Sequence, residues 1–172
     1  MDLLIFMVFN FVIYSFLGWI VENMYSLITI KSLKKDGFLN GPFKPMYGFA
    51  AAILVFLNEY MEFNLLVMVM LAFVIPTAVE YLTGYMLKEW FNKSYWDYSK
   101  LKYNLDGIIS FKFSLYWIIL SFFTMYCIQP LLEIIFEKSF IFWSVFIPII
   151  IMCITIDFLF TLKSIEKREV LK

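Results

Sequence analysis

Three carboxylates stand inside long apolar stretches of the chain, at Glu22, Glu80 and Asp157. An ionisable group at the centre of a bilayer costs about 3 kcal/mol or more, so each of these acids needs a physical reason. Glu22 and Glu80 stand nine and eight residues before the next lysine, so on a helix both lie roughly 12–13 Å inside the same edge. Asp157 lies about 9 Å inside that edge, six residues before a lysine. We hypothesise that the acids face a shared cavity and that Lys44 pairs with one of them.

The alternative is that these acids are interfacial, either hydrated or hydrogen-bonded to neighbours such as Asn23 and Tyr81. The chemistry expected of the shared cavity is binding: the carboxylates would supply charge or carry protons, and Lys44 would be a counter-ion or an anion contact. The chain has no histidine, which removes the commonest general base and metal ligand. No catalytic residue, metal site or cofactor is predicted. Without a phosphate-binding glycine loop, ATP hydrolysis would have to come from another protein.

The stretch GFLNGPFKPMYGFAA, residues 37–51, precedes the second apolar segment. Pro42 and Pro45 disfavour regular helix and push the residues before them toward extended backbone. Non-helical backbone survives at membrane depth only where it is buried in protein or lines a wet cavity, and interrupted segments point to transporter binding sites. We therefore expect the backbone from Asn40 to Pro45 to contribute to binding. The alternative is a tight cytoplasmic turn at 41–45, followed by a short span in a locally thinned membrane.

Composition places these groups in a membrane protein. The sequence is 63% hydrophobic and 16% charged, whereas soluble domains are about half apolar and a quarter charged. The bilayer is the obvious solvent for the excess apolar surface. Net charge is zero and no basic groove with stacking residues is evident, so no nucleic-acid partner is expected. The first stretch lacks the positive start and small-residue cleavage site of a signal peptide, and we interpret it as a retained membrane helix.

The apolar pattern predicts an all-α integral membrane protein that forms a single transmembrane domain over residues 1–172. The predicted spans are about 3–26, 41–58, 65–87, 111–132 and 140–162. The second is the awkward one. Its clean apolar run, Met46 to Leu57, has 12 residues and is roughly 18 Å long as a helix, which does not cross a 30 Å core. We expect this span to be broken at its cytoplasmic end and to borrow length from the preceding stretch.

The distribution of charge predicts the topology. Every lysine and arginine except Lys138 falls in the links 31–45 and 88–112 or in the C-terminal tail. The opposite links, 58–64 and 133–139, carry four glutamates. With five crossings these sets alternate, and the positive-inside rule puts the N-terminus outside and the C-terminus in the cytoplasm. The expected location is the bacterial cytoplasmic (inner) membrane, as a multi-pass protein.

The cytoplasmic link 88–112 interleaves aromatic residues with lysines, as is typical of segments that lie on a membrane surface and meet anionic headgroups. The alternative is a docking surface for a cytoplasmic partner. Trp96, Asp97 and Tyr98 are expected to roof the cavity from below or to contact that partner. Asn104 joins Asn40 among the polar residues expected to bind the solute or ion.

Five blocks of the chain resemble, in order, those of a known family: FLGWIVENMYS, GFLNGPFKPMYGFA, VEYLTGYMLKEWF, YWDYS and YNLDGIISFKFS. The family comprises bacterial membrane proteins called putative ABC-transporter type IV, or CmpB-like, and the resemblance covers about residues 12–118. It implies a multi-span protein labelled as a permease. Where such proteins often have arginines, this chain has Lys35 and Ile108, so an anion-binding role of those arginines does not carry over.

The leading hypothesis is a bacterial inner-membrane, permease-like transport subunit that binds a small solute or ion in a cavity of its cytoplasmic half. Its expected partners are the lipid bilayer and either further copies of itself or a separate transport subunit, with an ATPase possible in trans. One alternative is a non-catalytic accessory or regulatory subunit. Another is a membrane enzyme that modifies lipid, in which Glu22 and Glu80 would serve as acid and base if burial separated their pKa values.

Overall fold

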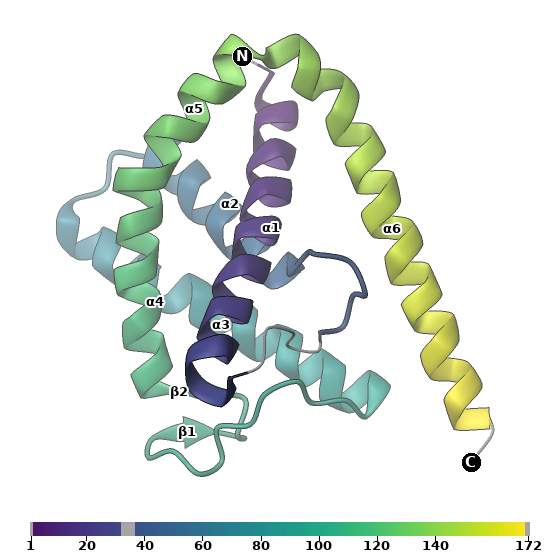
Figure 1. Ribbon diagram of the computed structural model, residues 1–172. Helices are drawn as coiled ribbons and strands as arrows, with labels where there is room; N and C mark the ends of the chain where they lie inside the picture. Colours follow the sequence, from purple (N-terminus) through teal and green to yellow (C-terminus); the bar gives the residue numbers. More distant parts are fainter. Residues whose placement is uncertain (1, 32–36, 171–172) are drawn as a thin grey trace. The chain divides into compact units, whose positions relative to one another are not determined.

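The computed structural model describes residues 2–31 and 37–170 of the chain, and most of these residues are helical (Figure 1). The helices are α1 (Leu3–Ile30), α2 (Pro45–Tyr60), α3 (Leu65–Phe91), α4 (Phe111–Phe123), the π-helical turn η1 (Thr124–Ile128), α5 (Gln129–Lys138) and α6 (Phe140–Val170). A short antiparallel hairpin pairs β1 (Asn104–Leu105) with β2 (Ile109–Ser110). Lys34 and Lys35 of the first basic link lie outside the described residues.

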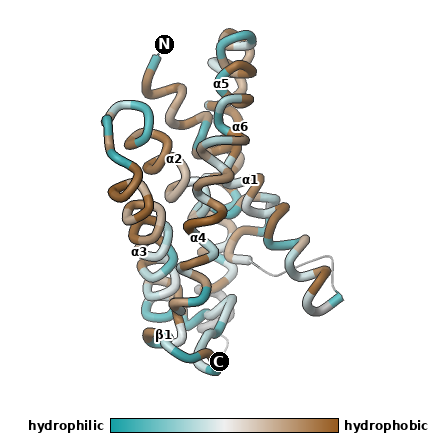
Figure 2. The backbone as a smooth tube through the Cα atoms, turned by 90° about the vertical axis from the view of Figure 1, so that its left-hand side faces the viewer, coloured by the Kyte–Doolittle hydropathy of each residue, from teal (hydrophilic) through white to brown (hydrophobic). Residues whose placement is uncertain are grey.

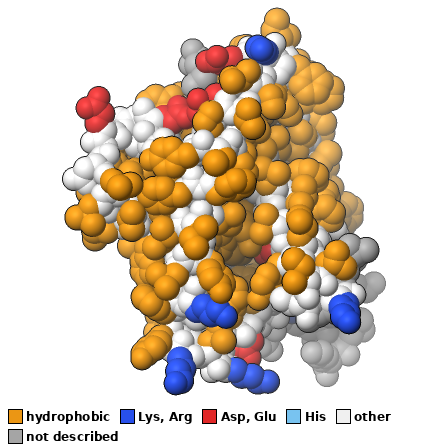
Figure 3. Space-filling model, turned by 60° about the vertical axis from the view of Figure 1, so that its left-hand side comes forward, with side chains coloured by type: hydrophobic (Ala, Val, Ile, Leu, Met, Phe, Trp, Pro, Cys, Tyr) orange, Lys and Arg blue, Asp and Glu red, His pale blue; other side chains and the backbone are white. Residues whose placement is uncertain are grey.

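Within the described residues, four helical stretches are long and apolar enough to cross a membrane. They are Leu3–Thr29, Leu65–Phe91, Phe111–Lys138 and Phe140–Ile165. Hydrophobic residues predominate along these helices (Figure 2), and hydrophobic side chains cover most of the face drawn in Figure 3. The prediction of an all-α membrane protein is confirmed. α2 has only 16 residues, fewer than a bilayer crossing needs, so the fifth crossing stays a prediction.

Polar residues in the links close the ends of the apolar helices. The Asp2 carboxylate accepts hydrogen bonds from the backbone N–H groups of Leu4 and Ile5, so that it caps α1. Asn64 caps α3 in the same way. α3 ends at Asn92, which adopts the left-handed conformation and whose N–H donates to the Lys88 carbonyl at 3.1 Å. The otherwise orphaned backbone groups of these helix ends are thereby satisfied outside the apolar stretches.

α4, η1 and α5 form one continuous stretch whose middle changes helix type. Pro130 has no N–H, and its ring excludes the carbonyl four residues earlier. The chain accommodates this with a wider π turn, in which the Gln129 N–H donates to the Thr124 carbonyl five residues back. The stretch therefore continues through the proline.

The chain divides into two compact units. The first contains Met1–Gly48 and Ile141–Lys172, and the second contains Phe49–Phe140. In the first unit, the rings of Phe9 in α1 and Trp143 in α6 meet edge to face at 4.8 Å. The second unit has its own small core of Leu54, Met68 and Met125.

Candidate functional site

Residues 37–44, which we call the inserted segment, form non-helical backbone packed between α1 and α6 of the first unit. Buried Leu39 forms one apolar cluster with Val12 of α1 and Ile154 of α6. The Lys44 backbone N–H donates to the Ser15 carbonyl at 2.9 Å. Ser15 lies twelve residues beyond the start of α1, about 18 Å along the helix. The inserted segment therefore reaches the middle of an apolar helix long enough to span a membrane.

The first turn of α2 lies so close to α1 that two positions leave no room for a side chain. A Cβ atom at Gly48 would overlap the Ser15 hydroxyl and the Phe11 carbonyl oxygen, and one at Gly18 would overlap the Tyr47 ring. The Ser15 hydroxyl itself donates to the Phe11 carbonyl at 2.7 Å. These close approaches fix the start of α2 against the middle of α1.

Lys44 forms an ion pair with Glu22, with 3.0 Å between Nζ and Oε2, and both side chains are only 12% exposed. This is the pairing of Lys44 with an acid that the sequence predicts. Gly37 makes room for it, because a Cβ there would overlap the Lys44 ammonium. An ammonium has three donors and a carboxylate several acceptor positions, so such a pair has capacity to contact a solute or ion as well.

Asp157 of α6 holds the inserted segment from the other side. Its carboxylate accepts a hydrogen bond from the Gly41 N–H at 2.8 Å and another from the Asn40 side-chain amide at 3.0 Å. The same amide donates to the Thr161 hydroxyl at 3.1 Å. The structure thus brings Asn40 and Asp157 together as a clamp on the segment, and their role in binding a solute stays a prediction.

Glu80 lies in the second unit and is almost completely buried, at 3% exposure. Its carboxylate accepts hydrogen bonds from the Tyr98 hydroxyl at 3.0 Å and from the Trp117 indole N–H at 2.8 Å. The Tyr98 ring stacks on Phe113 with 4.6 Å between centroids. Glu80 and the Lys44–Glu22 pair belong to different units, and their predicted convergence on one cavity stays a prediction.

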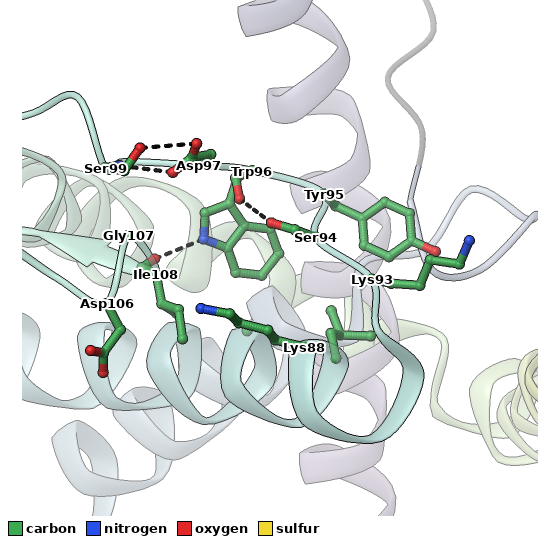
Figure 4. A pocket seen from close by; sticks show the side chains of 12 residues that line it. Lys88, Lys93, Ser94, Tyr95, Trp96, Asp97, Ser99, Asp106, Gly107 and Ile108 are labelled. Carbon is green, nitrogen blue, oxygen red and sulfur yellow. Dashed lines mark hydrogen bonds between the residues drawn. The ribbon is translucent and has the colours of Figure 1, made fainter.

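The link between α3 and α4 is held together by its own hydrogen bonds. The Trp96 indole N–H donates to the Ile108 carbonyl, and the Tyr98 backbone N–H donates to the Gly107 carbonyl, both at 2.8 Å. With the end of α3, this link lines an open pocket of about 560 Å³ (Figure 4). Trp96 and Asp97 line this pocket. Tyr98 does not, and its hydroxyl donates to Glu80 instead.

Two polar residues of the link shape its turns. Asp97 accepts hydrogen bonds from the backbone N–H and hydroxyl of Ser99, at 2.8 and 3.0 Å, and these bonds lower the pKa of the Asp97 carboxyl. Asn104 donates to the Leu101 carbonyl at 2.7 Å and accepts from the Gly107 N–H at 3.1 Å. Asn104 therefore closes a local turn, and its predicted contact with a solute stays untested.

One carboxylate cluster was not predicted from the sequence. Glu59, at the end of α2 and beyond the predicted second span, hydrogen-bonds to Glu133 of α5. Burial and this bond, in that order, raise the pKa of Glu59 to about 7. The buried Gln129 side chain donates to Glu133 at 3.1 Å. The only signal in the sequence was that both glutamates fall in links predicted on the same side of the membrane.

These features define an α-helical membrane protein with a non-helical, ion-paired segment packed against two of its apolar helices. The chain belongs to the family described as putative ABC-transporter type IV, whose model matches residues 9–162. The resemblance found in the sequence is confirmed. Neither a curated protein nor a solved structure matches the chain.

Proposed function

We propose that the chain is a permease-like transport subunit of the bacterial inner membrane that binds a small solute or ion beside the inserted segment. The observation that carries this proposal is the ion pair between Lys44 and Glu22. Each side chain is 12% exposed, and Glu22 belongs to an apolar helix long enough to span a membrane. Charges at membrane depth mark substrate and ion pathways. Broken helices whose ends meet within the membrane form the binding sites of many transporters.

The inserted segment also supports five crossings. α2 begins at the level of Ser15, about 18 Å from the outer end of α1 in the predicted topology. Its 16 residues make a helix of about 24 Å, enough to cross the remaining half of the bilayer. In this arrangement the inserted segment lies beside α1 and connects to α2 at mid-membrane, and α2 crosses the outer half. The short second span then needs no thinning of the membrane.

In the proposed site Lys44 contacts an anionic group and Glu22 binds a cation or carries a proton. The positive end of the α2 dipole begins next to Lys44, which favours negative charge at this position. A solute with an acidic group would compete with Glu22 for the ammonium, so binding and ion-pair opening are coupled. Glu80 would supply a second charge in the cytoplasmic half, and Asp157 would keep the inserted segment in place.

An accessory or regulatory subunit is the second candidate, and the link between α3 and α4 favours it. Several large apolar side chains beside and within this link are exposed, including Trp90, Tyr103 and Leu105, as a docking surface for a cytoplasmic partner such as an ATPase requires. For such a subunit, Glu22→Gln and Glu80→Gln would leave function intact, while changes in the link would abolish partner binding. The transport proposal predicts the reverse.

A ligand screen by thermal shift tests the binding site. Purified protein in detergent is heated with a panel of inorganic ions, amino acids, organic acids and sugars. A compound at 100 times its Kd stabilises by about 2.7 kcal/mol. We expect some anionic or zwitterionic compound to stabilise the wild type and the exposed control variant Lys163→Gln, but not Lys44→Gln. Compounds that stabilise all three proteins equally would place binding elsewhere.

Cysteine labelling tests the second crossing. In a background with Cys127→Ala and Cys153→Ala, single cysteines are placed at Lys31 and Glu62, on either side of the inserted segment and α2. In intact cells, a membrane-impermeant maleimide should label Glu62→Cys and should reach Lys31→Cys only after permeabilisation. Equal labelling of both from one side would mean that α2 does not cross.

A further inference from the structure

The pocket beneath the end of α3 is a separate site that the proposed transport function does not use. Gly84 and Leu87 of α3 line it, together with Trp96 and Ile108 of the link (Figure 4). A Cβ at Gly84 would overlap the Ile108 side chain and stand 3.0 Å from the Trp96 ring. The link therefore packs directly on α3 at Gly84. The volume of the pocket, about 560 Å³, is in the range of small-molecule sites.

Two lysines line this pocket. Lys88 comes from the last turn of α3 and Lys93 from the start of the link. In the part of the chain that the structure describes, neither forms an ion pair. Figure 4 shows the Lys88 ammonium beside Trp96 and Ile108, whereas the Lys93 side chain extends toward Tyr95, away from Lys88. The pocket therefore offers two ammonium groups whose charge is not matched by a direct carboxylate contact.

The two acids that share the pocket are already engaged. Ser99 donates two hydrogen bonds to Asp97, one to each carboxylate oxygen. The Tyr81 hydroxyl donates to Asp106 at 2.9 Å. Both carboxylates thus serve the folding of the link, which leaves the lysine ammonium groups to contact a ligand. This pattern suits an anionic ligand with several acceptor oxygens.

The position of the pocket along α3 indicates where such a ligand comes from. The pocket begins at Gly84, in the last two turns of the apolar stretch Leu65–Phe91. In these turns the side chains of Met86 and Trp90 are exposed, which suits contact with lipid. A tryptophan at the end of a spanning helix marks the layer where acyl chains meet headgroups. The pocket therefore opens at the depth of lipid phosphates.

We propose that this pocket binds the phosphate-bearing headgroup of an anionic phospholipid, with Lys88 as its phosphate contact and Lys93 as a second basic group farther along the pocket. Lysine is a common phosphate ligand, acting as a point charge. Basic pockets at the cytoplasmic ends of spanning helices are suited to lipid headgroups. The proposal is independent of solute transport, because none of the residues around Lys44 lines the pocket.

The test compares two double variants with the same change in charge. Full-length protein in a nonionic detergent is titrated with phosphatidylglycerol, and bound lipid is counted by native mass spectrometry. Lys88→Gln/Lys93→Gln should weaken the tightest binding about tenfold or more, as expected for loss of a charge-assisted hydrogen bond. Lys100→Gln/Lys102→Gln changes exposed lysines of the same link that do not line the pocket, and it should change binding by less than about threefold.

Further arms separate the sources of phosphate and control for folding. Lys88→Arg/Lys93→Arg keeps both charges and should retain binding, and unchanged thermal unfolding of every variant excludes misfolding. Glycerol 3-phosphate carries the same phosphate ester without acyl chains. Binding of glycerol 3-phosphate but not of the lipid would overturn the proposal in favour of a soluble ligand. Equal losses in the two glutamine double variants, or no loss in either, would overturn it as well.

Discussion

Removal of the Lys44 charge tests the inserted segment most directly. Lys44→Gln leaves Glu22 without its cation at a site where both side chains are 12% exposed and 3.0 Å apart. Breaking a fully buried pair costs about 3–5 kcal/mol, whereas an exposed pair contributes about 0–1 kcal/mol. At 12% exposure, this pair is closer to a fully buried pair than to an exposed one. Because neither side chain is completely buried, we expect Lys44→Gln to lower the free energy of unfolding by about 2–4 kcal/mol.

A double-mutant cycle separates the pair from its surroundings. Glu22→Gln, Lys44→Gln and the double variant are unfolded by denaturant in mixed micelles, with helicity followed by circular dichroism. The double variant should be more stable than the sum of the single losses predicts, with a coupling of about 1–3 kcal/mol. Lys163→Gln, at an exposed position of α6, should change stability by less than about 0.5 kcal/mol. Losses at Glu22 and Lys44 that add to within about 0.5 kcal/mol would refute the pair as an energetic unit.

Three further predictions concern other contacts. Gly48→Ala should lower the free energy of unfolding by about 1–3 kcal/mol in the same assay, because its Cβ would overlap atoms of α1; wild-type stability would mean that the close approach is not formed. Tyr98→Phe removes the hydroxyl that donates to Glu80 at 3.0 Å and should cost about 1–3 kcal/mol; no loss in an unfolding titration would show that the bond does not form. The pKa of Glu59 is raised from 4.5 to about 7 in the folded protein, so the folded state binds more protons and the melting temperature should fall as pH rises through this window. Glu59→Gln should flatten that dependence, and an unchanged slope would exclude the carboxyl pair.

Hydropathy predicted the helices well because a spanning segment has to satisfy its backbone hydrogen bonds internally. The predicted spans 3–26 and 65–87 correspond to α1 and α3, which continue to Ile30 and Phe91. Both helices run longer than predicted because charges mark the edge of the membrane rather than the end of a helix. The proline pair predicted the break before α2 for a local reason, since each proline disfavours helix in the residue before it, and Pro45 is itself the first residue of α2.

The partners of the buried acids could not be predicted in the same way. Apolar length gives the depth of a residue but not the rotation of its helix or the identity of the neighbouring helix. Trp117 as a donor to Glu80, and Glu133 as a partner of Glu59, therefore emerged only from the three-dimensional arrangement. Asn104 illustrates a different limit. Its hydrogen bonds close a local turn, as asparagine commonly does, and the prediction of a solute contact at Asn104 did not take this local chemistry into account.

Stability alone does not explain why an ion pair lies on the apolar helix α1. Well-packed apolar side chains of similar volume are often as stabilising as a buried pair, because removing two charges from water offsets their attraction. The glycines at positions 18, 37 and 48 hold space for the lysine and for the first turn of α2, which costs the chain packing that larger residues would supply. Asp157 also holds the inserted segment in place, by accepting hydrogen bonds from Asn40 and Gly41. Several positions of the fold thus hold one charged pair on an apolar helix, which supports the proposal that the pair binds a solute or ion.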